Sequence, residues 1–322
     1  HQCGEEENYL GVEKLARILF LQDVWIEYYG VMQISAVLKK NSHEVDILFA
    51  DNEDTVRYIE ETKPDIIAFS CMSIQWQWAK SLSSEIKQKG IDTPQIMGGI
   101  HPTMYPEETM SHPAIDVICV NEGEYPLLEF CEAIDNGTDY SNIRNIWVRE
   151  NGSIKRNPMR PKLKREELDS LPFADRDLYR KYKYFRNYPF AIFVGSRGCP
   201  FKCTFCEVPE IDARYGGGKA VYYRSVDNLI EEIETAKERG LLAGRLVMFT
   251  DSTFNSHKSW FIDFMKSYKE RLGDPFSCNL RVDLVTEEQV KAMKDAGCDN
   301  VRFGVESGES DIRNKILNKK FT

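Results

Sequence analysis

Residues 190–206 read Phe190-Ala191-Ile192-Phe193-Val194-Gly195-Ser196-Arg197-Gly198-Cys199-Pro200-Phe201-Lys202-Cys203-Thr204-Phe205-Cys206. The apolar run predicts a buried strand, and the stretch with glycine and proline after it predicts a compact loop where the strand ends. Three cysteines in this loop follow C-x3-C-x2-C spacing. Three neighbouring thiolates suit a soft metal centre, and they leave one metal position open for a ligand other than protein.

Two other uses of clustered cysteines fit the sequence less well. A structural zinc site is normally closed by four ligands, often as two pairs. Here Cys278 and Cys298 are single and far apart, and no histidine lies within about thirty residues of the triplet. The chain has nine cysteines, an odd number, which argues against a disulfide framework. We therefore predict an open metal cluster in this loop.

The triplet, with Phe205 directly before its third cysteine, resembles the signature of the radical S-adenosylmethionine (SAM) enzymes. The resemblance implies that Cys199, Cys203 and Cys206 hold a 4Fe-4S cluster, that the fourth iron binds SAM, and that Phe205 packs beside the adenine. In this family the reduced cluster cleaves SAM to methionine and a 5'-deoxyadenosyl radical. The cofactors carry that chemistry, and the protein positions them.

Length and composition describe an ordinary soluble protein that is large enough for two domains. The chain has 322 residues, of which 42% are hydrophobic and 29% charged. Its net charge of -9 gives no electrostatic case for binding nucleic acid or an anionic membrane. Six Lys or Arg lie between Lys155 and Arg165, but two glutamates follow at once. This favours a solvated linker face over a phosphate-binding patch.

The compartment and the ends of the chain are also predicted. No apolar run approaches the ~20 residues of a membrane span, and the acidic start is unlike a signal peptide. Many unpaired cysteines favour the reducing cytoplasm. The chain begins with His1 and stops at Thr322 within a charged, helical run. We expect a fragment of a longer protein.

Residues 1–145 alternate short apolar runs with amphipathic stretches. This alternation predicts a Rossmann-like, doubly wound parallel sheet, whose ligands bind beyond the carboxyl ends of the strands. None of the loops there reads G-x-G-x-x-G, so dinucleotide binding has no support. We expect strands at 16–21, 44–49, 65–70, 95–97 and 116–120, with helices at 30–40, 54–62 and 79–89.

The loops after these strands resemble the cobalamin-binding domain, whose pattern is D-x-H-x-x-G, S-x-L and G-G in that order. Here 41 residues separate Tyr28 from Ser70, and 25 separate Met72 from Gly98, close to the spacings of that family. Where the family has its cobalt-ligating histidine this chain has Trp25, and an indole nitrogen cannot coordinate cobalt. Radical SAM enzymes with a cobalamin domain often lack this histidine.

The resemblance places Ser70, Gly98 and Gly99 around the nucleotide tail of cobalamin, where the glycines would allow close approach of the ligand. His101 and Thr103 belong to the string Gly-Gly-x-His-Pro-Thr, which looks like that of the cobalamin-containing enzymes. Two roles are open for His101 from the sequence: a contact with the cofactor, or a structural hydrogen bond to a neighbouring loop. Glu122 and Glu124 are expected in a loop that faces the second domain, without a catalytic role.

Residues 146–189 read as a hairpin followed by a connector. Asn151-Gly152 predicts the hairpin turn, and three prolines with mixed charges predict an extended segment. Tyrosines and Phe185 near its end, interleaved with Lys and Arg, are a pattern also found in single-strand nucleic-acid binding. We expect them instead to pack the connector against both domains.

Residues 190–322 show four successive strand–helix units, which predict part of a TIM-like (β/α) barrel with active-site groups at the carboxyl ends of its strands. The radical SAM barrel commonly has six units, so the barrel should be truncated at its C-terminal side. We expect strands at 191–194, 245–250, 277–282 and 300–305, and helices at 226–239, capped by Ser225, 259–271 and 287–296.

Polar residues fall at the predicted strand ends, as the radical SAM barrel requires. By the resemblance, Arg281 would pair with the SAM carboxylate, since a guanidinium binds a carboxylate in two places at once. Asp251, Glu306 and Ser307 are the other candidates for SAM, at its amine or ribose. A structural salt bridge is the alternative for each charged residue.

The sequence thus predicts an α/β protein: a cobalamin-binding domain, a connector and a radical SAM core. The resemblance implies a 4Fe-4S cluster, SAM, cobalamin, a small-molecule substrate and an electron donor such as flavodoxin or ferredoxin. The implied reaction is methylation of an unactivated carbon, with cobalamin as methyl carrier. One alternative is a cobalamin-dependent radical rearrangement, cyclisation or oxidation. Another is a redox sensor that binds the cofactors without turnover.

Overall fold

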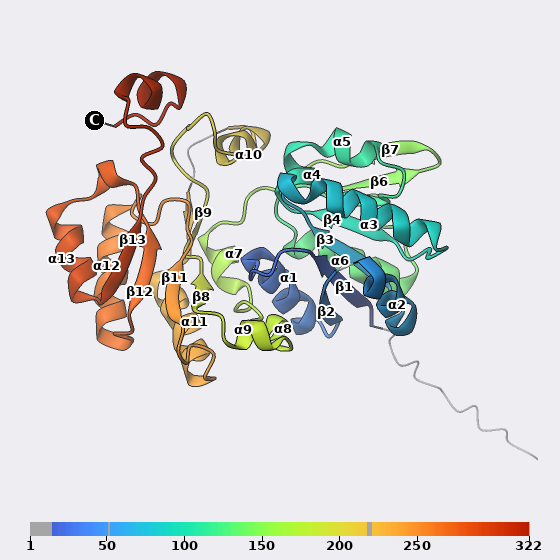
Figure 1. The fold of residues 1–322 in the computed structure, drawn as a ribbon, viewed down its shortest axis with the longest axis horizontal. Coiled ribbons are helices and arrows are strands. Elements are labelled where there is room, and N and C mark those ends of the chain that lie inside the picture. The colour runs from blue at the N-terminus through green and yellow to red at the C-terminus, as the bar shows by residue number, and fades with distance from the viewer. Residues whose placement is uncertain (1–14, 51, 218–220, 322) are drawn as a thin grey trace, which may run out of the picture.

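The structure is a computed structural model that describes residues 15–50, 52–217 and 221–321. Two α/β units lie side by side, and a chain segment with three short helices runs between them (Figure 1). Every strand and helix expected from the sequence is present within three residues at each end. The predicted fold class is confirmed.

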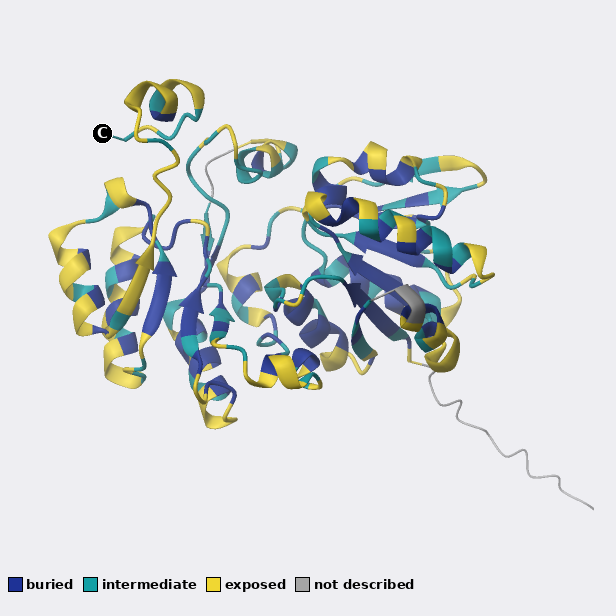
Figure 2. Ribbon diagram, in the orientation of Figure 1, coloured by how far each residue is buried: buried dark blue, intermediate teal, exposed yellow. Residues whose placement is uncertain are grey.

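The first unit is a seven-stranded sheet in the order β2-β1-β3-β4-β5-β6-β7. β1 to β5 are parallel, and β6 and β7 follow as an antiparallel pair. Helices cover both faces, so β1 is buried along almost its whole length (Figure 2). The elements are β1 (Arg17–Gln22), α1 (Tyr29–Lys40), β2 (Glu44–Phe49), α2 (Asn52–Thr62), β3 (Ile66–Ser70), the 3-10 turn Ser73–Gln75, α3 (Trp76–Gln88), β4 (Gln95–Gly98), α4 (Ile100–Met104), α5 (Pro106–Ser111), β5 (Val117–Cys119), α6 (Glu124–Asn136), β6 (Ile146–Glu150) and β7 (Ser153–Arg156).

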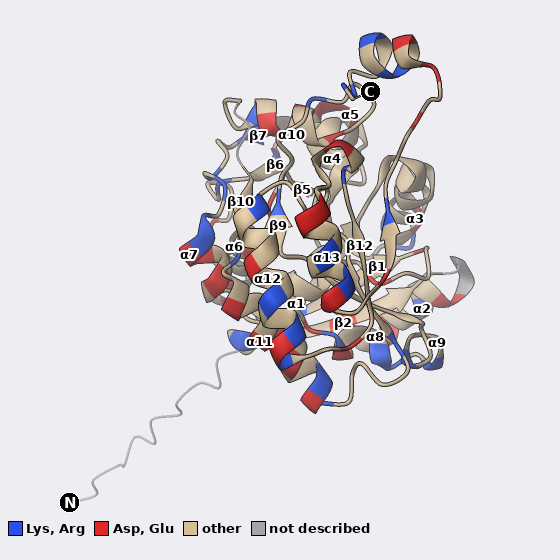
Figure 3. Cartoon of the chain, turned by 90° about the vertical axis from the view of Figure 1, so that its left-hand side faces the viewer, with Lys and Arg blue, Asp and Glu red and all other residues tan. Residues whose placement is uncertain are grey.

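The hairpin predicted at the start of the connector is present, with Asn151 and Gly152 both at positive φ in its turn. It does not stand apart, because β6 pairs with β5 and extends the first sheet. Three of the six basic residues in the stretch 155–165 form ion pairs: Arg156 with Glu107, Arg160 with Glu129 and Lys162 with Asp212. On the face of helices α11 to α13 both signs of charge are mixed (Figure 3).

The second unit is a parallel four-stranded sheet in the order β13-β12-β11-β8. Its core is rich in stacked aromatic rings, among them Phe249 against Phe254 and Trp260 against Phe264. Ser225 caps α11 by accepting a hydrogen bond from the Asn228 N–H, as predicted. The elements are β8 (Phe190–Phe193), β9 (Ser196–Arg197), α10 (Val208–Arg214), β10 (Tyr222–Tyr223), α11 (Val226–Glu238), β11 (Leu246–Phe249), α12 (Lys258–Arg271), β12 (Phe276–Asn279), a 3-10 turn (Val282–Leu284), α13 (Glu287–Asp295), β13 (Cys298–Arg302) and a π-helical turn (Ile312–Ile316).

The connector contains α7 (Arg165–Ser170), α8 (Asp177–Arg180) and α9 (Lys183–Arg186). Its aromatic residues join the core of the first unit, where Tyr179 and Phe185 are fully buried. Its charged residues bind the second unit, because Arg176 pairs with Glu232 and Asp177 with Arg239. The connector therefore packs against both units, by apolar contacts on one side and ion pairs on the other.

The two units also bind each other directly. Glu27, in the loop after β1, pairs with Arg245 at the start of β11, with both side chains at 2% exposure or less. Among the described residues, no helix combines the length and apolarity that a membrane crossing requires.

Candidate functional site

The three cysteines of the triplet lie around one cavity of about 330 Å³ at the carboxyl ends of β11, β12 and β13. We call it the cluster cavity. Each thiol is partly exposed to it. The loop leaves β9 through Gly198, whose φ of +93° favours glycine. The cavity is lined by Cys199, Phe201, Cys203, Phe205, Cys206, Ser252, Thr253, Asn279, Leu280, Arg281, Arg302, Phe303, Gly304, Glu306 and Lys319.

The three thiols surround one cavity without converging on a single point, an arrangement that is compatible with a cluster. Across residues 15–50, 52–217 and 221–321, no three His, Cys, Asp or Glu side chains meet closely enough to bind one metal ion. An iron–sulfur cluster takes each thiolate on a different iron, so the sulfurs need not converge on one point. Arg281 adds positive charge here, with its Nη1 3.8 Å from Cys203 Sγ.

Asp251 lies behind the cysteine loop and does not line the cluster cavity. Its buried carboxylate accepts hydrogen bonds from the Gly195 N–H (3.1 Å) and the Ser196 hydroxyl (2.5 Å). Burial raises the pKa of Asp251 to about 6, although these hydrogen bonds oppose the rise. The structure thus gives Asp251 a supporting role at the base of the loop, where Thr253 Oγ1 also lies 3.3 Å from Cys199 Sγ.

The other residues predicted for SAM divide into two groups. Phe205, Arg281 and Glu306 line the cluster cavity. Arg281 lies over the Phe201 ring, 3.7 Å from its centre, and pairs with Asp283 at 2.8 Å. Ser307 lies outside the cavity, where its hydroxyl accepts a hydrogen bond from the Glu309 N–H.

Sequence reasoning missed Lys319 in the cluster cavity. Its Nζ lies 2.9 Å from Glu306 Oε1 and 5.7 Å from the centre of the Phe205 ring. The segment that carries Lys319 is tied to the cysteine loop, since the Thr204 N–H donates to the Leu317 carbonyl and the Asn318 amide donates to the Lys202 carbonyl. No motif in the sequence signals this return of the chain.

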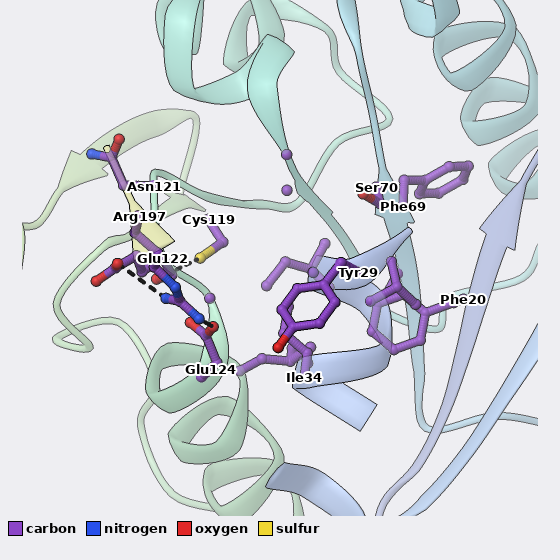
Figure 4. Close-up of a pocket in the computed structure, with 18 of the residues that line it drawn as sticks. Phe20, Tyr29, Ile34, Phe69, Ser70, Cys119, Asn121, Glu122, Glu124 and Arg197 are labelled. Atoms are coloured by element: carbon purple, nitrogen blue, oxygen red, sulfur yellow. Dashed lines mark hydrogen bonds and ion pairs between the residues drawn. The ribbon is translucent and has the colours of Figure 1, made fainter. Parts of the chain in front are cut away.

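A second hollow of about 340 Å³ lies between the first sheet and helices α1 and α6. We call it the sheet cleft (Figure 4). Ser70, Gly98 and Gly99, the residues predicted for the tail of cobalamin, are all among its lining residues. Most of its wall is apolar, which suits a flat aromatic ligand group. The cleft is lined by Phe20, Tyr29, Gly30, Val31, Ile34, Ala68, Phe69, Ser70, Ile96, Gly98, Gly99, Cys119, Asn121, Glu122, Gly123, Glu124, Leu127, Val194 and Arg197.

The two glycines of the sheet cleft serve different purposes. A Cβ on Gly99 would lie 2.9 Å from the backbone nitrogen and oxygen of Cys71, and its φ is +98°. The fold therefore requires glycine there with or without a ligand. A Cβ on Gly98 would make only ordinary contacts, the nearest at 3.8 Å from Cys119 Cβ. A larger side chain at Gly98 would occupy space in the cleft.

His101 and Thr103 both lie outside the sheet cleft. The His101 ring is buried and stacks on Trp76, with ring centres 4.7 Å apart. Its Nδ1 lies 3.2 Å from Ser73 Oγ, and burial lowers its pKa. These contacts support a structural hydrogen bond as the role of His101, the alternative to a contact with the cofactor. Thr103 donates a hydrogen bond to the Gly99 carbonyl and accepts one from the Asn121 N–H.

A third cavity, of about 290 Å³, lies between α4 and α10, on the side of the sheet cleft that faces the cysteine loop. We call it the bridging cavity. It shares Gly99, Asn121, Glu122 and Arg197 with the sheet cleft, and it reaches Gly198 beside the first cysteine. Its lining residues are Gly99, Ile100, Thr103, Asn121, Glu122, Lys162, Arg197, Gly198, Val208, Ile211, Asp212 and Tyr215.

Trp25 lines none of these cavities. Its indole stacks on Phe49, with ring centres 4.3 Å apart, and meets the edges of Tyr182 and Tyr184 from the connector. Glu27 holds the same loop to Arg245. The loop is therefore used to join the units.

Two family models match the chain. One, described as a B12 binding domain, matches residues 26–130, and the other, the radical SAM superfamily, matches residues 193–322. The first covers the loops around the sheet cleft, and the second covers the cluster cavity. Both predicted resemblances are confirmed.

Similar proteins agree with these two matches. An uncharacterized methyltransferase of Pyrococcus horikoshii is 30% identical over 287 residues, 86% of this chain and 60% of that protein. An anaerobic magnesium-protoporphyrin IX monomethyl ester cyclase of Rubrivivax gelatinosus is 28% identical over 92% of this chain and 54% of its own length. The chain thus spans about half to two thirds of the length of these relatives.

The fold of the whole chain also has a solved counterpart. The cobalamin-dependent S-adenosylmethionine radical enzyme OxsB, solved with aqua-cobalamin and S-adenosylmethionine, superposes with a TM-score of 0.77 over 96% of this chain and 46% of its own. The two are 21% identical, so the likeness is one of fold. With a B12-binding domain followed by a radical SAM domain, the chain belongs to the cobalamin-dependent radical SAM family.

Proposed function

We propose that this protein is a radical SAM enzyme that uses a 4Fe-4S cluster, SAM and cobalamin to methylate an unactivated carbon of a small molecule. The observation that carries the proposal is that a cysteine-lined cavity and an apolar cleft occur in one chain, with a third cavity on the path between them. The bridging cavity shares four lining residues with the sheet cleft and reaches Gly198, which directly precedes Cys199 of the cluster cavity. A substrate between the two sites would be within reach of both cofactors.

When bound, the cluster and SAM supply a radical that abstracts hydrogen, and cobalamin supplies a methyl group. The chain's own part in the cluster cavity is to hold and orient. Cys199, Cys203 and Cys206 ligate the cluster. Arg281 and Lys319 offer cations to the SAM carboxylate, while Glu306 and Phe205 border the places where its amine and adenine would lie.

In the sheet cleft, the chain contributes shape more than charge. Phe20, Ile34 and Leu127 give an apolar wall for the nucleotide base of cobalamin. Ser70 offers a hydroxyl, and Gly98 leaves room for the tail to enter. Tight, dry packing of an aromatic base in such a cleft is the main source of affinity.

We also propose that the loop after β1 gives cobalt no ligand. Trp25 occupies the histidine position of the family and is packed against the connector. A weakly ligated lower face would favour methyl donation as a radical. Electron paramagnetic resonance (EPR) of cob(II)alamin on ¹⁵N-labelled protein tests this: splitting from ¹⁵N would reveal a protein nitrogen on cobalt and contradict the proposal.

Methyl transfer has two rivals. The first is a radical rearrangement, cyclisation or oxidation that uses both cofactors, and the similarity to a cyclase supports it. A sensor would bind the cofactors without turnover. Methyl-labelled SAM separates the three. Label in product supports methylation, unlabelled product supports the first rival, and absence of 5'-deoxyadenosine after reduction supports the sensor. The electron for this assay is proposed to come from a flavodoxin or ferredoxin, for which dithionite can substitute.

A further inference from the structure

Arg197 lies on the boundary between the two cofactor sites. It is the second residue of β9, two positions before Cys199. Its Nη1 lies 3.0 Å from Glu122 Oε1 and its Nη2 lies 2.5 Å from Glu124 Oε1 (Figure 4). Glu122 lies in the loop after β5 and Glu124 is at the start of α6, and both line the sheet cleft. We call these three residues the arginine bridge.

The arginine bridge is held by further hydrogen bonds at both ends. β9 pairs with β10, so the backbone at Arg197 is held in a ladder. Glu122 accepts a second hydrogen bond, from the Leu163 N–H, and its carbonyl accepts one from the Asn145 amide. Glu124 is the first residue of α6 and is almost fully buried. A bidentate guanidinium between fixed partners specifies geometry more strictly than a point charge.

The arginine bridge contains one positive charge, on Arg197, and two carboxylates, on Glu122 and Glu124. The Arg197 guanidinium is permanently charged, and it lies between these two carboxylates. Breaking such a cluster would leave a buried carboxylate without a partner, which is costly. The bridge therefore resists opening.

The arginine bridge is not needed merely to hold the units together. The buried pair of Glu27 with Arg245 already joins them, and Lys162 of the connector pairs with Asp212 of the second unit. What distinguishes Arg197 is its place, because it lines both the sheet cleft and the bridging cavity and continues directly into the cysteine loop. Its loss should shift the two cofactor sites relative to each other without separating the units.

We propose that Arg197 is a positioning residue that fixes how the cluster and the cobalamin face each other, by locking the cysteine loop to the Glu122–Glu124 segment. This inference rests on the proposed function, because it requires that the protein binds both the cluster and cobalamin. The expected consequence of losing Arg197 is uncoupling, in which SAM is still cleaved but fewer methyl groups reach product for each 5'-deoxyadenosine formed.

The test compares the whole protein, loaded with both cofactors, as wild type, Arg197→Gln and Arg197→Lys. Arg271→Gln is the matched control, because Arg271 also binds two carboxylates, Glu234 and Asp227, but on the surface of α12. Pulsed EPR between cob(II)alamin and the one-electron-reduced cluster gives the distribution of their separation. Labelled methyl per 5'-deoxyadenosine is measured on the same samples.

We expect Arg197→Gln to widen the distribution of cluster–cobalt distances about twofold. The yield of labelled methyl per 5'-deoxyadenosine should fall about tenfold or more. Arg197→Lys should fall between, and Arg271→Gln should match wild type. If Arg197→Gln cannot hold a cofactor, the double variant Glu122→Gln with Glu124→Gln, which leaves the cysteine loop unchanged, is measured in its place.

A distribution in Arg197→Gln or the double variant that matches wild type would overturn the inference. The result also separates this inference from the proposed function. A narrow wild-type distribution that the variants widen supports Arg197 even if no methyl transfer is found. Methyl transfer that proceeds with unchanged coupling in the variants supports the function and rejects the role of Arg197.

Discussion

The sheet cleft is enclosed by regular strands and helices, whereas the cluster cavity is formed mostly by loops and by a segment near residue 319. The cleft is mostly apolar, as suits a ligand held by burial. The cluster cavity is more polar than the cleft, and its thiols and cations suit ligands held by coordination and charge. Two different kinds of binding thus meet at the arginine bridge, and a change in one site should leave the other intact.

The largest effect is expected for Cys203→Ala. Losing one of three thiolates should remove the cluster and lower 5'-deoxyadenosine formation at least about 1,000-fold. Cobalamin binding should persist, because Cys203 is remote from the sheet cleft. Iron content, 5'-deoxyadenosine and bound cobalamin are measured together. Equal loss of cobalamin would show that the sites are not independent.

The converse change is Gly98→Leu, which fills the sheet cleft. The added side chain should weaken cobalamin binding about 100-fold, since overpacking costs typically 1–3 kcal/mol. Cobalamin titration gives the affinity, and 5'-deoxyadenosine formation without substrate serves as control and should match wild type. Undiminished affinity would mean that the cofactor tail does not enter this cleft.

Asp251→Asn tests the support behind the cysteine loop. The pKa of Asp251 is about 6 in the folded protein against 3.8 as its ordinary value. The folded state therefore binds the proton more tightly, and wild type loses stability as pH rises from about 4 to 6. Relative to wild type, Asp251→Asn should gain up to about 3 kcal/mol over that interval. Urea unfolding of iron-free protein at several pH values measures it, and parallel curves would contradict the expectation.

The smallest effect is expected for Trp25→His, which restores the family's histidine. Because this loop is held by Glu27 and packs on the connector, the imidazole should not reach cobalt. Stability should fall by about 1–2 kcal/mol from lost aromatic stacking. The cob(II)alamin spectrum on ¹⁵N-labelled variant should match that of labelled wild type. New ¹⁵N splitting would show that the loop can turn toward the cleft.

The elements of the fold could be predicted well because their patterns are local. A continuous apolar run such as Ile66–Ser70 indicates a buried strand, and the spacing of apolar residues in Val226–Glu238 indicates a helix. The antiparallel join of β6 to the first sheet was not predicted, since pairing between distant strands leaves little trace in either one. The short helices α4, α5 and α10 were also missed, as were α7 to α9 in the connector that was expected to be extended, because few residues are available to show a period. The longer helix α6 was missed as well.

The cluster cavity could be predicted only where its residues are close in sequence. The cysteines and Phe205 form a motif, but Lys319 reaches the cavity through hydrogen bonds to the loop that no spacing reveals. Asp251 was expected at SAM because it ends a strand, and it lies one layer behind. Arg197 was overlooked because its meaning depends on Glu122 and Glu124, more than seventy residues away.

If the proposed function is correct, both cofactors serve one reaction in this chain. Protein reconstituted with iron, sulfide and cobalamin, then reduced in the presence of methyl-labelled SAM, tests this without knowledge of the substrate. We expect both 5'-deoxyadenosine and labelled methyl on the protein-bound cobalamin. Formation of neither, in protein shown to carry a full cluster and one cobalamin, would contradict it.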